Sequence, residues 1–522
     1  MKPLMLKKIS KKPSLLIILC SLSTMYLTAC DSNGSSSTAS LNDSVTASDD
    51  NITAPDDSVT ASQILIGIPE PEFGINETHE MYVGQYYEAG GFDYQDAGNG
   101  PYTHYVDKDD LNSTDTDNEY GSPEMPRSSI PTTLPAGSVV EIHGTGYIAP
   151  RTVGKYQYIF NSEGTKDLPV FVRGYATTAS IAITSPVNVV GEYLVIENLY
   201  FDQVGMQIPY AQNGETAHAQ FISIRNNEFE GNGKVGNGSV IGITTINNDD
   251  LVENIVLYKN EIKYFGKHDH TTENDYHAVG VGKNSKYVWM LNNHTHHNGG
   301  DSIQVRFYSS SPDFTPQYIY IGGNEMHDDA ENAVDLKGCL DVIVSGNNMY
   351  NYDGFAGTTD SGTPFVAHYD TPSSNYSQRV WVIGNDIHDA LGAASSVTSG
   401  PDEIYFVGNK IYNIKNESGT ASAFISWSSK NQYSVNNTIT NSDIGINYFS
   451  GNGAEYRVTI ENNLFSDLTT DNYIDLSNDS YAANAIVDSN LFYHSTLTPS
   501  ISGDDTNSIF DSPLFDDVDL HL

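Results

Sequence analysis

One short phrase recurs from about residue 194 onward. Each copy has a short run of alternating apolar side chains, then an asparagine, then a second apolar residue two positions later. The closest copies are marked by Asn324 and Asn347, and the most widely spaced by Asn347 and Asn385. Repetition at intervals of roughly 20 to 40 residues is typical of a solenoid, in which each repeat stacks on its neighbours. The asparagines that mark the copies are Asn227, Asn260, Asn293, Asn324, Asn347, Asn385, Asn409, Asn437 and Asn462.

The alternating runs predict β-strands, as in Ile255–Leu257 and Val342–Val344. The sequence between them lacks a long 3.6-period segment with helix caps, so crossover helices are not expected. An asparagine at a turn suits left-handed backbone geometry and can hydrogen-bond to the asparagine of the next turn. We therefore expect the strands to coil, with the asparagines in a structural role at one corner of every turn.

The charge balance restricts the partners. The 522 residues include 25 Lys and Arg against 66 Asp and Glu, which gives a net charge of −41. A general basic surface for nucleic acid or for an anionic membrane is therefore excluded, and any basic site must be local. Because 38% of the residues are hydrophobic, the chain can still bury a large core, and its turn-rich composition favours an all-β protein.

The N-terminus predicts export and attachment to a membrane. A lysine-rich start precedes an apolar stretch that is too short to span a bilayer, which is typical of a signal peptide. The stretch ends in Leu27–Thr28–Ala29–Cys30, which resembles the lipobox of bacterial lipoproteins and implies cleavage before Cys30 and lipidation of its sulfur. An ordinary signal peptide is the alternative. We expect a signal peptide over 1–29, a polar tether over 30–63, and a lipid-anchored protein of the cell envelope, at the outer membrane or the cell surface.

The repeats resemble the right-handed parallel β-helix of the pectate-lyase-like superfamily, and the resemblance covers roughly residues 136–500. It implies an all-β solenoid of roughly ten to twelve rungs. Residues 64–135 are rich in Tyr, Gly, Asp and Pro without repeats, and they are expected to form a lead-in and an N-terminal cap, since an open first rung would expose a sheet edge. Residues 501–522 form an acidic tail, and we expect a monomer.

Three basic residues fall in one column when the repeats are superimposed. Arg306 follows Asn293 at the same spacing at which Lys337 follows Asn324. His368 fits the same strand of the next rung. With neighbouring strands about 4.8 Å apart, these side chains should form a row on one outward face, where mutual repulsion should lower the pKa of Lys337. The alternative is a solvated ion-pair ladder without catalytic function.

Several acidic residues lie near this column. The strand around Glu331 loosely resembles the acidic calcium strand of a pectate-lyase family, and calcium prefers several oxygen ligands. We therefore expect Ca²⁺ as the cofactor. The candidate ligands are Asp301, Asp328, Glu331 and Asp335.

The phrase Val334–Asp335–Leu336–Lys337 resembles the strand that carries the catalytic lysine in β-helical alginate and chondroitin lyases. The resemblance implies a lyase that acts on an anionic polysaccharide by β-elimination. Lys337 would then be the base, Arg306 the group that neutralises the substrate carboxylate, and His368 or Tyr369 the acid. The alternatives are a glycoside hydrolase that uses two of Glu331, Asp335 and Asp301, and a polysaccharide-binding adhesin without activity.

A histidine-rich stretch lies on the two preceding rungs. It begins with His268, His270 and His277, and it continues as His294–Thr295–His296–His297. Alternation places His294 and His296 on one face of a strand, where they could bind a transition metal, although no compact metal motif such as H-E-x-x-H accompanies them. We instead assign His277 and His297, together with Tyr308, to substrate binding.

Overall fold

The computed structural model divides into two units, Met1–Ile64 and Leu65–Leu522. The predicted signal peptide, Cys30 and the tether lie outside the described residues, as do His268, His270, Tyr308 and the last nine residues of the predicted tail. No helix in the described part of the chain is long and apolar enough to cross a membrane. The described residues are 67–82, 92–148, 159–175, 182–209, 217–267, 274–307, 309, 311–353, 362–370, 375–398, 400–427, 430–449, 457–476, 484–494, 498, 500–501 and 505–513.

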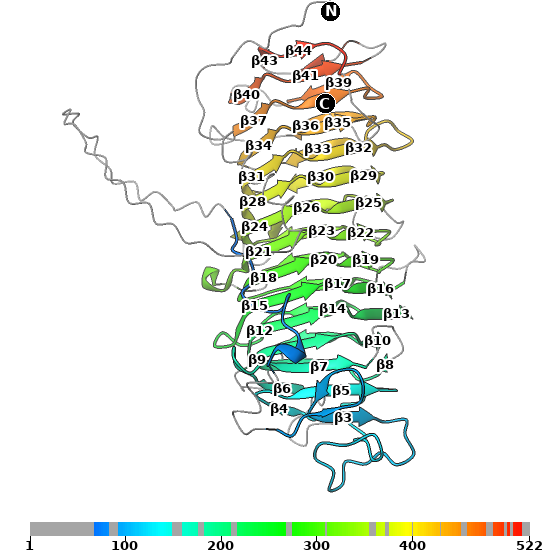
Figure 1. Cartoon of the computed structure of the whole chain (residues 1–522). Coiled ribbons are helices and arrows are strands. Elements are labelled where there is room, and N and C mark those ends of the chain that lie inside the picture. Colours follow the sequence, from blue (N-terminus) through cyan, green and yellow to red (C-terminus); the bar gives the residue numbers. More distant parts are fainter. Residues whose placement is uncertain are drawn as a thin grey trace, which may run out of the picture. The chain divides into compact units, whose positions relative to one another are not determined.

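The second unit is a stack of coiled rungs, each built from up to three strands that pair in parallel with the rungs on either side (Figure 1). Corresponding strands thereby form three long parallel sheets. The first sheet contains β3 (His104–Asp107), β5 (Val139–His143), β7 (Val170–Gly174), β9 (Val187–Glu197), β12 (His218–Arg225), β15 (Leu251–Tyr258), β18 (Ser285–Leu291), β21 (Gln317–Gly322), β24 (Leu340–Ser345), β28 (Gln378–Ile383), β31 (Asp402–Val407), β34 (Asn431–Val435), β37 (Arg457–Glu461), β40 (Ala485–Asp488) and β43 (Asp505–Thr506).

The second sheet holds 13 of the described strands. It contains β8 (Ala182–Ile183), β10 (Tyr200–Asp202), β13 (Glu228–Lys234), β16 (Glu261–Phe265), β19 (His294–His296), β22 (Glu325–His327), β25 (Asn348–Tyr352), β29 (Asp386–Ala390), β32 (Lys410–Ile414), β35 (Thr438–Thr440), β38 (Leu464–Ser466), β41 (Leu491–Tyr493) and β44 (Ile509–Phe510).

The third sheet completes each rung. It contains β11 (Met206–Ile208), β14 (Gly238–Ile243), β17 (Tyr276–Val281), β20 (Ile303–Arg306), β23 (Val334–Lys337), β26 (Phe365–Asp370), β30 (Ala393–Thr398), β33 (Ser422–Trp427), β36 (Ile444–Phe449), β39 (Asn472–Asp475) and β42 (Ser500–Ile501).

A few short elements accompany these sheets. β4 and β6 pair with each other, and β6 pairs with the first half of β9. The elements are β1 (Gln95–Asp96), β2 (Pro101–Tyr102), β4 (Thr133–Pro135), β6 (Ile159–Glu163), β27 (Asn375–Tyr376) and the single-turn 3₁₀ helices η1 (His79–Tyr82) and η2 (Pro312–Phe314).

The predicted all-β fold is confirmed: the chain forms a right-handed parallel β-helix. The rungs extend past the predicted limits of 136 and 500, because β3 pairs with β5 near the start and β44 pairs with β41 near the end. Inward side chains form columns of aliphatic residues, since strand alternation places every second residue inside. One such column contains Ile222, Ile255, Val288, Ile319, Val342, Val380 and Ile404, all fully buried.

The asparagine ladder forms at the corner between the first and second sheets. The Asn324 side-chain amide donates to Oδ1 of Asn347 at 2.9 Å and to the carbonyl of Met290 at 2.9 Å. The members from Asn227 to Asn463 repeat this pattern, so each buried side-chain amide is satisfied by an asparagine of the next rung and a carbonyl of the preceding rung. The predicted ninth member is wrong by one position, because Asn463 and not Asn462 accepts from Asn437, and the ladder continues to Asn490. The residue with left-handed backbone geometry is the one before each ladder asparagine, such as Asn462 with φ 56°.

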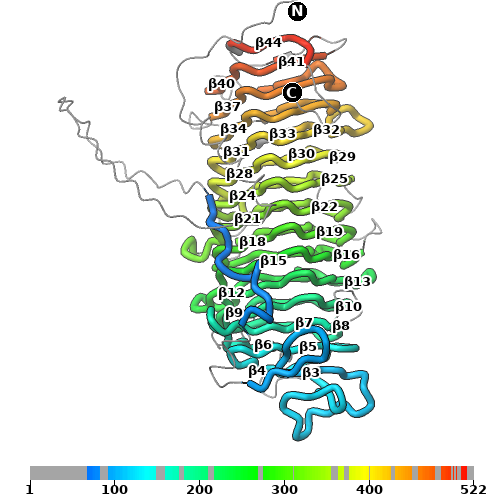
Figure 2. The backbone as a smooth tube through the Cα atoms, viewed as in Figure 1, coloured from blue at the N-terminus to red at the C-terminus, as the bar shows by residue number. Residues whose placement is uncertain are grey.

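The segment 67–82 runs along the outer face of the first sheet (Figure 2). The Arg225 guanidinium donates to the carbonyls of Gly74, Ile75 and Glu77. The Trp289 indole donates to the carbonyl of Pro69 at 2.9 Å. These long-range contacts cover part of the first sheet from outside.

Candidate active site

The predicted basic column forms on the outward face of the third sheet. β20, β23 and β26 are consecutive parallel neighbours, and their register pairs Arg306 with Lys337 and Lys337 with His368. Alternation sends Val334 and Leu336 into the core, while Asp335 and Lys337 point outward. Spacing from the ladder asparagines was therefore sufficient to predict this register.

Asp335 lies between two members of the column. Its Oδ2 is 2.5 Å from Nζ of Lys337 and its Oδ1 is 3.1 Å from Nε2 of His368, while the Asp335 side chain is only 2% exposed. Burial disfavours its charge, but His368 and Lys337 outweigh burial and lower the pKa of Asp335. The carboxylate therefore holds both basic groups in fixed positions.

The predicted lowering of the Lys337 pKa is wrong. Burial acts in that direction, but the carboxylates of Asp335 and Asp301 outweigh burial and raise the pKa. Neighbouring cations alone would lower the pKa of Lys337. A carboxylate two positions earlier on the same face of the strand lies closer and has the opposite effect. Lys337 is therefore an ammonium ion near neutral pH.

A second buried ion pair lies beside this column. His277 Nδ1 is 3.1 Å from Oδ2 of Asp301, and His277 Nε2 is 2.9 Å from Oδ1 of Asp275. Burial alone would lower the pKa of His277, but the two carboxylates raise it to about 10. The side chain of His277 is only 6% exposed and both of its nitrogens lie against carboxylates, and its predicted role in substrate binding stays a prediction.

Asp301 is fully buried. Its Oδ1 accepts from the amide of Asn332 at 3.1 Å, and its Oδ2 accepts from the side chain of Gln304 at 3.0 Å. Burial and the nearby Asp335 carboxylate raise its pKa. Two neighbouring carboxylates thus have pKa values shifted in opposite directions.

The four predicted calcium ligands do not assemble as one group. Asp335 is bound by Lys337 and His368, Asp301 is bound by His277 and Gln304, and Asp328 accepts from Nδ1 of His327 at 2.6 Å on the second sheet. Glu331 instead joins Asp275 and His277, with one donor atom of each within 4.8 Å of the others. This set contains a nitrogen donor and only two carboxylates, so it does not fit the oxygen-rich coordination of calcium.

The remaining predicted residues are spread around the site. Tyr369 follows His368 directly, but it leaves the parallel stack to pair with Tyr376 in an antiparallel hairpin, with ring centroids 6.2 Å apart. His297 lies at the end of β19, where its Nδ1 is 2.8 Å from Nδ1 of His296. It therefore belongs to a histidine group on the second sheet, and its predicted contact with substrate stays a prediction.

Asp275 is the main residue that sequence reasoning missed. It precedes His277 by two positions, so strand alternation alone could have placed both side chains on one face. Gln304 was also missed. It stacks directly against Asp335 in the register, two residues before Arg306 on the same outward face.

No family model and no curated protein matches the chain. Solved structures are similar at low identity. A PL6 family polysaccharide lyase from Pseudopedobacter saltans is 16% identical, with 74% of this chain and 97% of that chain covered and a TM-score of 0.48.

Two further structures are similar at comparable identity and with lower TM-scores. A mannuronic acid specific polysaccharide family 6 lyase from human gut microbiota is 14% identical over 69% of this chain and 82% of that chain, with a TM-score of 0.41. The A-module of a mannuronan C-5 epimerase from Azotobacter vinelandii is 15% identical over 64% and 91% of the two chains, with a TM-score of 0.36. The stacked parallel sheets give this chain a right-handed parallel β-helix fold.

Proposed function

We propose that this protein is a surface-anchored enzyme that cleaves a uronic-acid-containing polysaccharide, such as alginate or pectate, by β-elimination. The observation that carries the proposal is the column of Arg306, Lys337 and His368, which projects from one outward face of a protein with a net charge of −41. An anionic polymer is repelled by most of such a surface, so a local row of cations is where its carboxylates can bind.

The basic groups suit the chemistry of β-elimination. A base removes the proton at C5, the electron pair forms the C4–C5 double bond, the C4–O4 bond breaks, and an acid protonates the departing oxygen. Negative charge develops on the substrate carboxylate during proton removal. The Lys337 ammonium and the Arg306 guanidinium can neutralise this charge, and a guanidinium can grip a carboxylate in two-pronged fashion.

The base is better assigned to His368 than to Lys337. The raised pKa of Lys337 keeps its proton in place, so Lys337 is poorly suited to accept the C5 proton. His368 also has a carboxylate partner, since Asp335 Oδ1 lies 3.1 Å from Nε2. A carboxylate on one ring nitrogen orients the ring and stabilises the imidazolium that forms when the other nitrogen takes the C5 proton. Tyr369 stays the predicted proton donor to O4.

Calcium stays a prediction that the geometry does not favour. Asp301 and Asp335 direct their oxygens at protein donors, and the steps above use only groups of the chain. Activity that survives treatment with the calcium chelator EGTA is therefore expected.

A glycoside hydrolase is the second candidate. Asp301 and Asp335 have pKa values shifted in opposite directions, as in an acid and base pair of a hydrolase. Asp301 is fully buried beneath His277 and Gln304, however, and cannot reach a glycosidic oxygen without rearrangement. This burial favours the lyase over the hydrolase.

The test is incubation of the protein, truncated before Cys30, with alginate, pectate, chondroitin and sulfated algal glycans, each with and without EGTA. A lyase generates new reducing ends together with ultraviolet absorbance from the C4–C5 double bond of the unsaturated uronide. New reducing ends without that absorbance would identify a hydrolase. Binding without either product would identify an adhesin and would contradict the enzymatic proposal.

The surface anchor is tested independently. Cys30→Ser should release the protein from the membrane fraction without changing the melting temperature of the β-helix, because Cys30 is not part of the unit Leu65–Leu522. Mass spectrometry of the mature N-terminus should find a lipidated Cys30. An unlipidated mature chain that begins at another residue would refute the anchor.

A further inference from the structure

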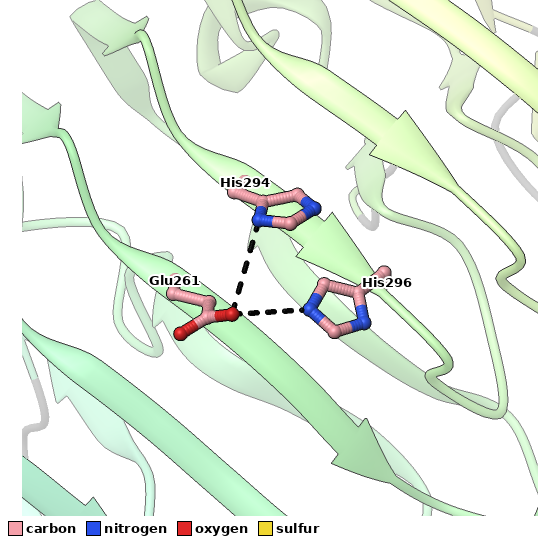
Figure 3. A group of neighbouring side chains, drawn as sticks. All are labelled: Glu261, His294 and His296. Atoms are coloured by element: carbon pink, nitrogen blue, oxygen red, sulfur yellow. Dashed lines mark hydrogen bonds and ion pairs between the residues drawn. The ribbon is translucent and has the colours of Figure 1, made fainter.

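A group of histidines and acidic residues lies on the outward face of the second sheet, away from the Arg306–Lys337–His368 column of the third sheet. Parallel pairing of β16, β19 and β22 aligns Glu261 with His294 and Glu325, and it aligns Lys263 with His296 and His327. His294 and His296 are two residues apart on one strand and so share its outward face. Figure 3 shows one oxygen of the Glu261 carboxylate directed at a nitrogen of each imidazole ring.

Three donor atoms converge in this group. Oε1 of Glu261 lies 3.2 Å from Nε2 of His296 and 3.8 Å from Nδ1 of His294 (Figure 3). One donor atom from each of the three residues lies within 4.8 Å of the others. A tetrahedral ion with bonds of about 2.0–2.1 Å separates its donors by about 3.3 Å, so small rotamer adjustments bring all three into range.

The second oxygen of Glu261 is already fixed. Oε2 accepts from Nζ of Lys263 at 3.0 Å, and the same ammonium is 2.8 Å from Glu228. This contact holds the carboxylate in place and leaves Oε1 directed at the two imidazoles. The carboxylate is therefore positioned before any ion arrives.

The outer nitrogens of both histidines have imidazole partners. His294 Nε2 is 2.8 Å from Nε2 of His327, whose Nδ1 is 2.6 Å from Oδ2 of Asp328. His296 Nδ1 is 2.8 Å from Nδ1 of His297. When these outer nitrogens carry the protons, His294 Nδ1 and His296 Nε2 present lone pairs to a carboxylate oxygen. Three converging acceptors repel one another unless a cation lies between them, and a metal-bound histidine typically donates its other ring N–H in this way.

Ring stacking does not account for the whole group. His296, His327, Tyr350, His388 and Tyr412 form a continuous outward column, with His296 and His327 centroids 5.1 Å apart and their planes within 1°. That column explains why rings occupy the His296 and His327 positions. His294 belongs to the adjacent column with Glu261 and Glu325, where stacking does not require an imidazole.

We propose that Glu261, His294 and His296 form a binding site for a divalent transition-metal cation of the zinc type. Two imidazole nitrogens and one carboxylate oxygen suit Zn²⁺, Cu²⁺ or Ni²⁺ and do not suit Ca²⁺ or Mg²⁺. Three protein ligands leave the fourth position of a tetrahedral ion for water or a ligand oxygen. Ions reach the site from solvent, since the His294 side chain is 38% exposed and that of Glu261 is 35% exposed.

The site is tested with Zn²⁺ as the probe. The chelator-treated protein is titrated with ZnCl₂ by isothermal calorimetry, and one saturable site per chain is expected. His294→Ala should weaken binding at this site at least about tenfold, and Glu261→Gln should do the same. His388→Ala is the matched control, because it removes an imidazole from the same outer face outside the triad and should leave the affinity unchanged. Ca²⁺ at millimolar concentration should not compete.

Two further measurements keep the test decisive. Melting curves of the metal-free variants establish that they are folded, and Co²⁺ in place of Zn²⁺ reports tetrahedral coordination through its visible absorption. Equal Zn²⁺ affinity in His294→Ala and the wild type would overturn the proposal, as would the absence of saturable binding up to about 1 mM. A loss of binding in Glu325→Gln with none in Glu261→Gln would also overturn it, because the ligands would then be His294, Glu325 and His327.

Discussion

The asparagine ladder and the basic column cross the same rungs. They differ in what provides each side chain with its hydrogen-bonding or ion-pair partner. In the ladder, Asn293 and Asn324 use identical bonds, because an amide both donates and accepts. In the column, Arg306, Lys337 and His368 are all cations or potential cations, so they cannot satisfy one another. Asp335 must be interposed between Lys337 and His368.

The comparison indicates which repeats are structural. A column that repeats one self-complementary side chain needs nothing beyond the next rung. A column of like charges is unfavourable by itself and needs partners of a different kind on neighbouring columns, which costs desolvation. A candidate active site is therefore recognised where, over a few rungs, a column contains side chains that cannot bond to one another.

Asp329 shares features with both the asparagine ladder and the charged column. At a second corner, Asn298 donates through its backbone amide and its side-chain amide to Oδ1 of Asp329, as a ladder asparagine does to the next one. The Ser302 hydroxyl donates to the other oxygen, and Tyr352 lies 3.0 Å from Ser302. A carboxylate here replaces the amide of the ladder and is fully enclosed.

The largest expected effect concerns the basic column. Lys337→Ala should reduce turnover by about 10² to 10⁴ on the polymer that the panel identifies, because an essential charge at the developing carboxylate is removed. Initial rates measure the loss, and a melting curve checks folding. The pH profile tests Lys337 as the base. A Lys337 base predicts a rate that rises only at strongly alkaline pH, since the pKa of Lys337 is raised. Full activity in Lys337→Ala would leave the ion-pair ladder as the explanation of the column.

The next effect concerns Asp329. Burial raises its pKa to about 7, although hydrogen bonds from Ser302 and Asn298 oppose this. Because the pKa in the folded state lies above the unfolded value of about 3.9, the protonated carboxyl stabilises the fold at low pH, and this contribution is lost as pH rises from about 4 to 7. Asp329→Asn should therefore reduce the loss of stability between pH 4 and pH 8 by on the order of 3 kcal/mol.

Denaturant unfolding of both proteins at several pH values measures this difference. Asp313→Asn, at a residue on the short helix η2 of an outer loop, is the control for a general change in net charge. Parallel stability curves for the wild type and Asp329→Asn would show that the buried carboxyl does not titrate in this range.

The smallest effect concerns the ladder itself. Asn324→Leu should lower the free energy of unfolding by about 1–3 kcal/mol, because Asn293 and Met290 lose their hydrogen-bonding partners in the core. Asn112→Leu, at an exposed position in a turn, should change it by less than about 0.5 kcal/mol. Urea unfolding distinguishes the two. Equal destabilisation by both substitutions would contradict the distinction between the ladder and an ordinary surface asparagine.

The sequence by itself determined the repeats, the strands and the register. Each of these depends on short-range periodicity: apolar residues alternate because every second side chain is inside, and an asparagine recurs because each turn must satisfy its buried amide. Equal spacing from Asn293 and Asn324 was therefore enough to align Arg306 with Lys337. The ladder position predicted at Asn462 is wrong by one residue, because two consecutive asparagines make the phrase ambiguous there.

Only the tertiary structure decided the electrostatics and the grouping of the site. The pKa of Lys337 is raised by Asp335 and Asp301, and the pKa of His277 is raised by Asp275 and Asp301. Several of these contacts join side chains of different strands and rungs. Asp328 was predicted to bind calcium together with Asp301, yet the turn between sheets directs it to His327. Burial and the direction of a side chain past a turn are set by the packing of whole rungs. A one-dimensional pattern specifies neighbours along a column, and it does not specify distances between columns.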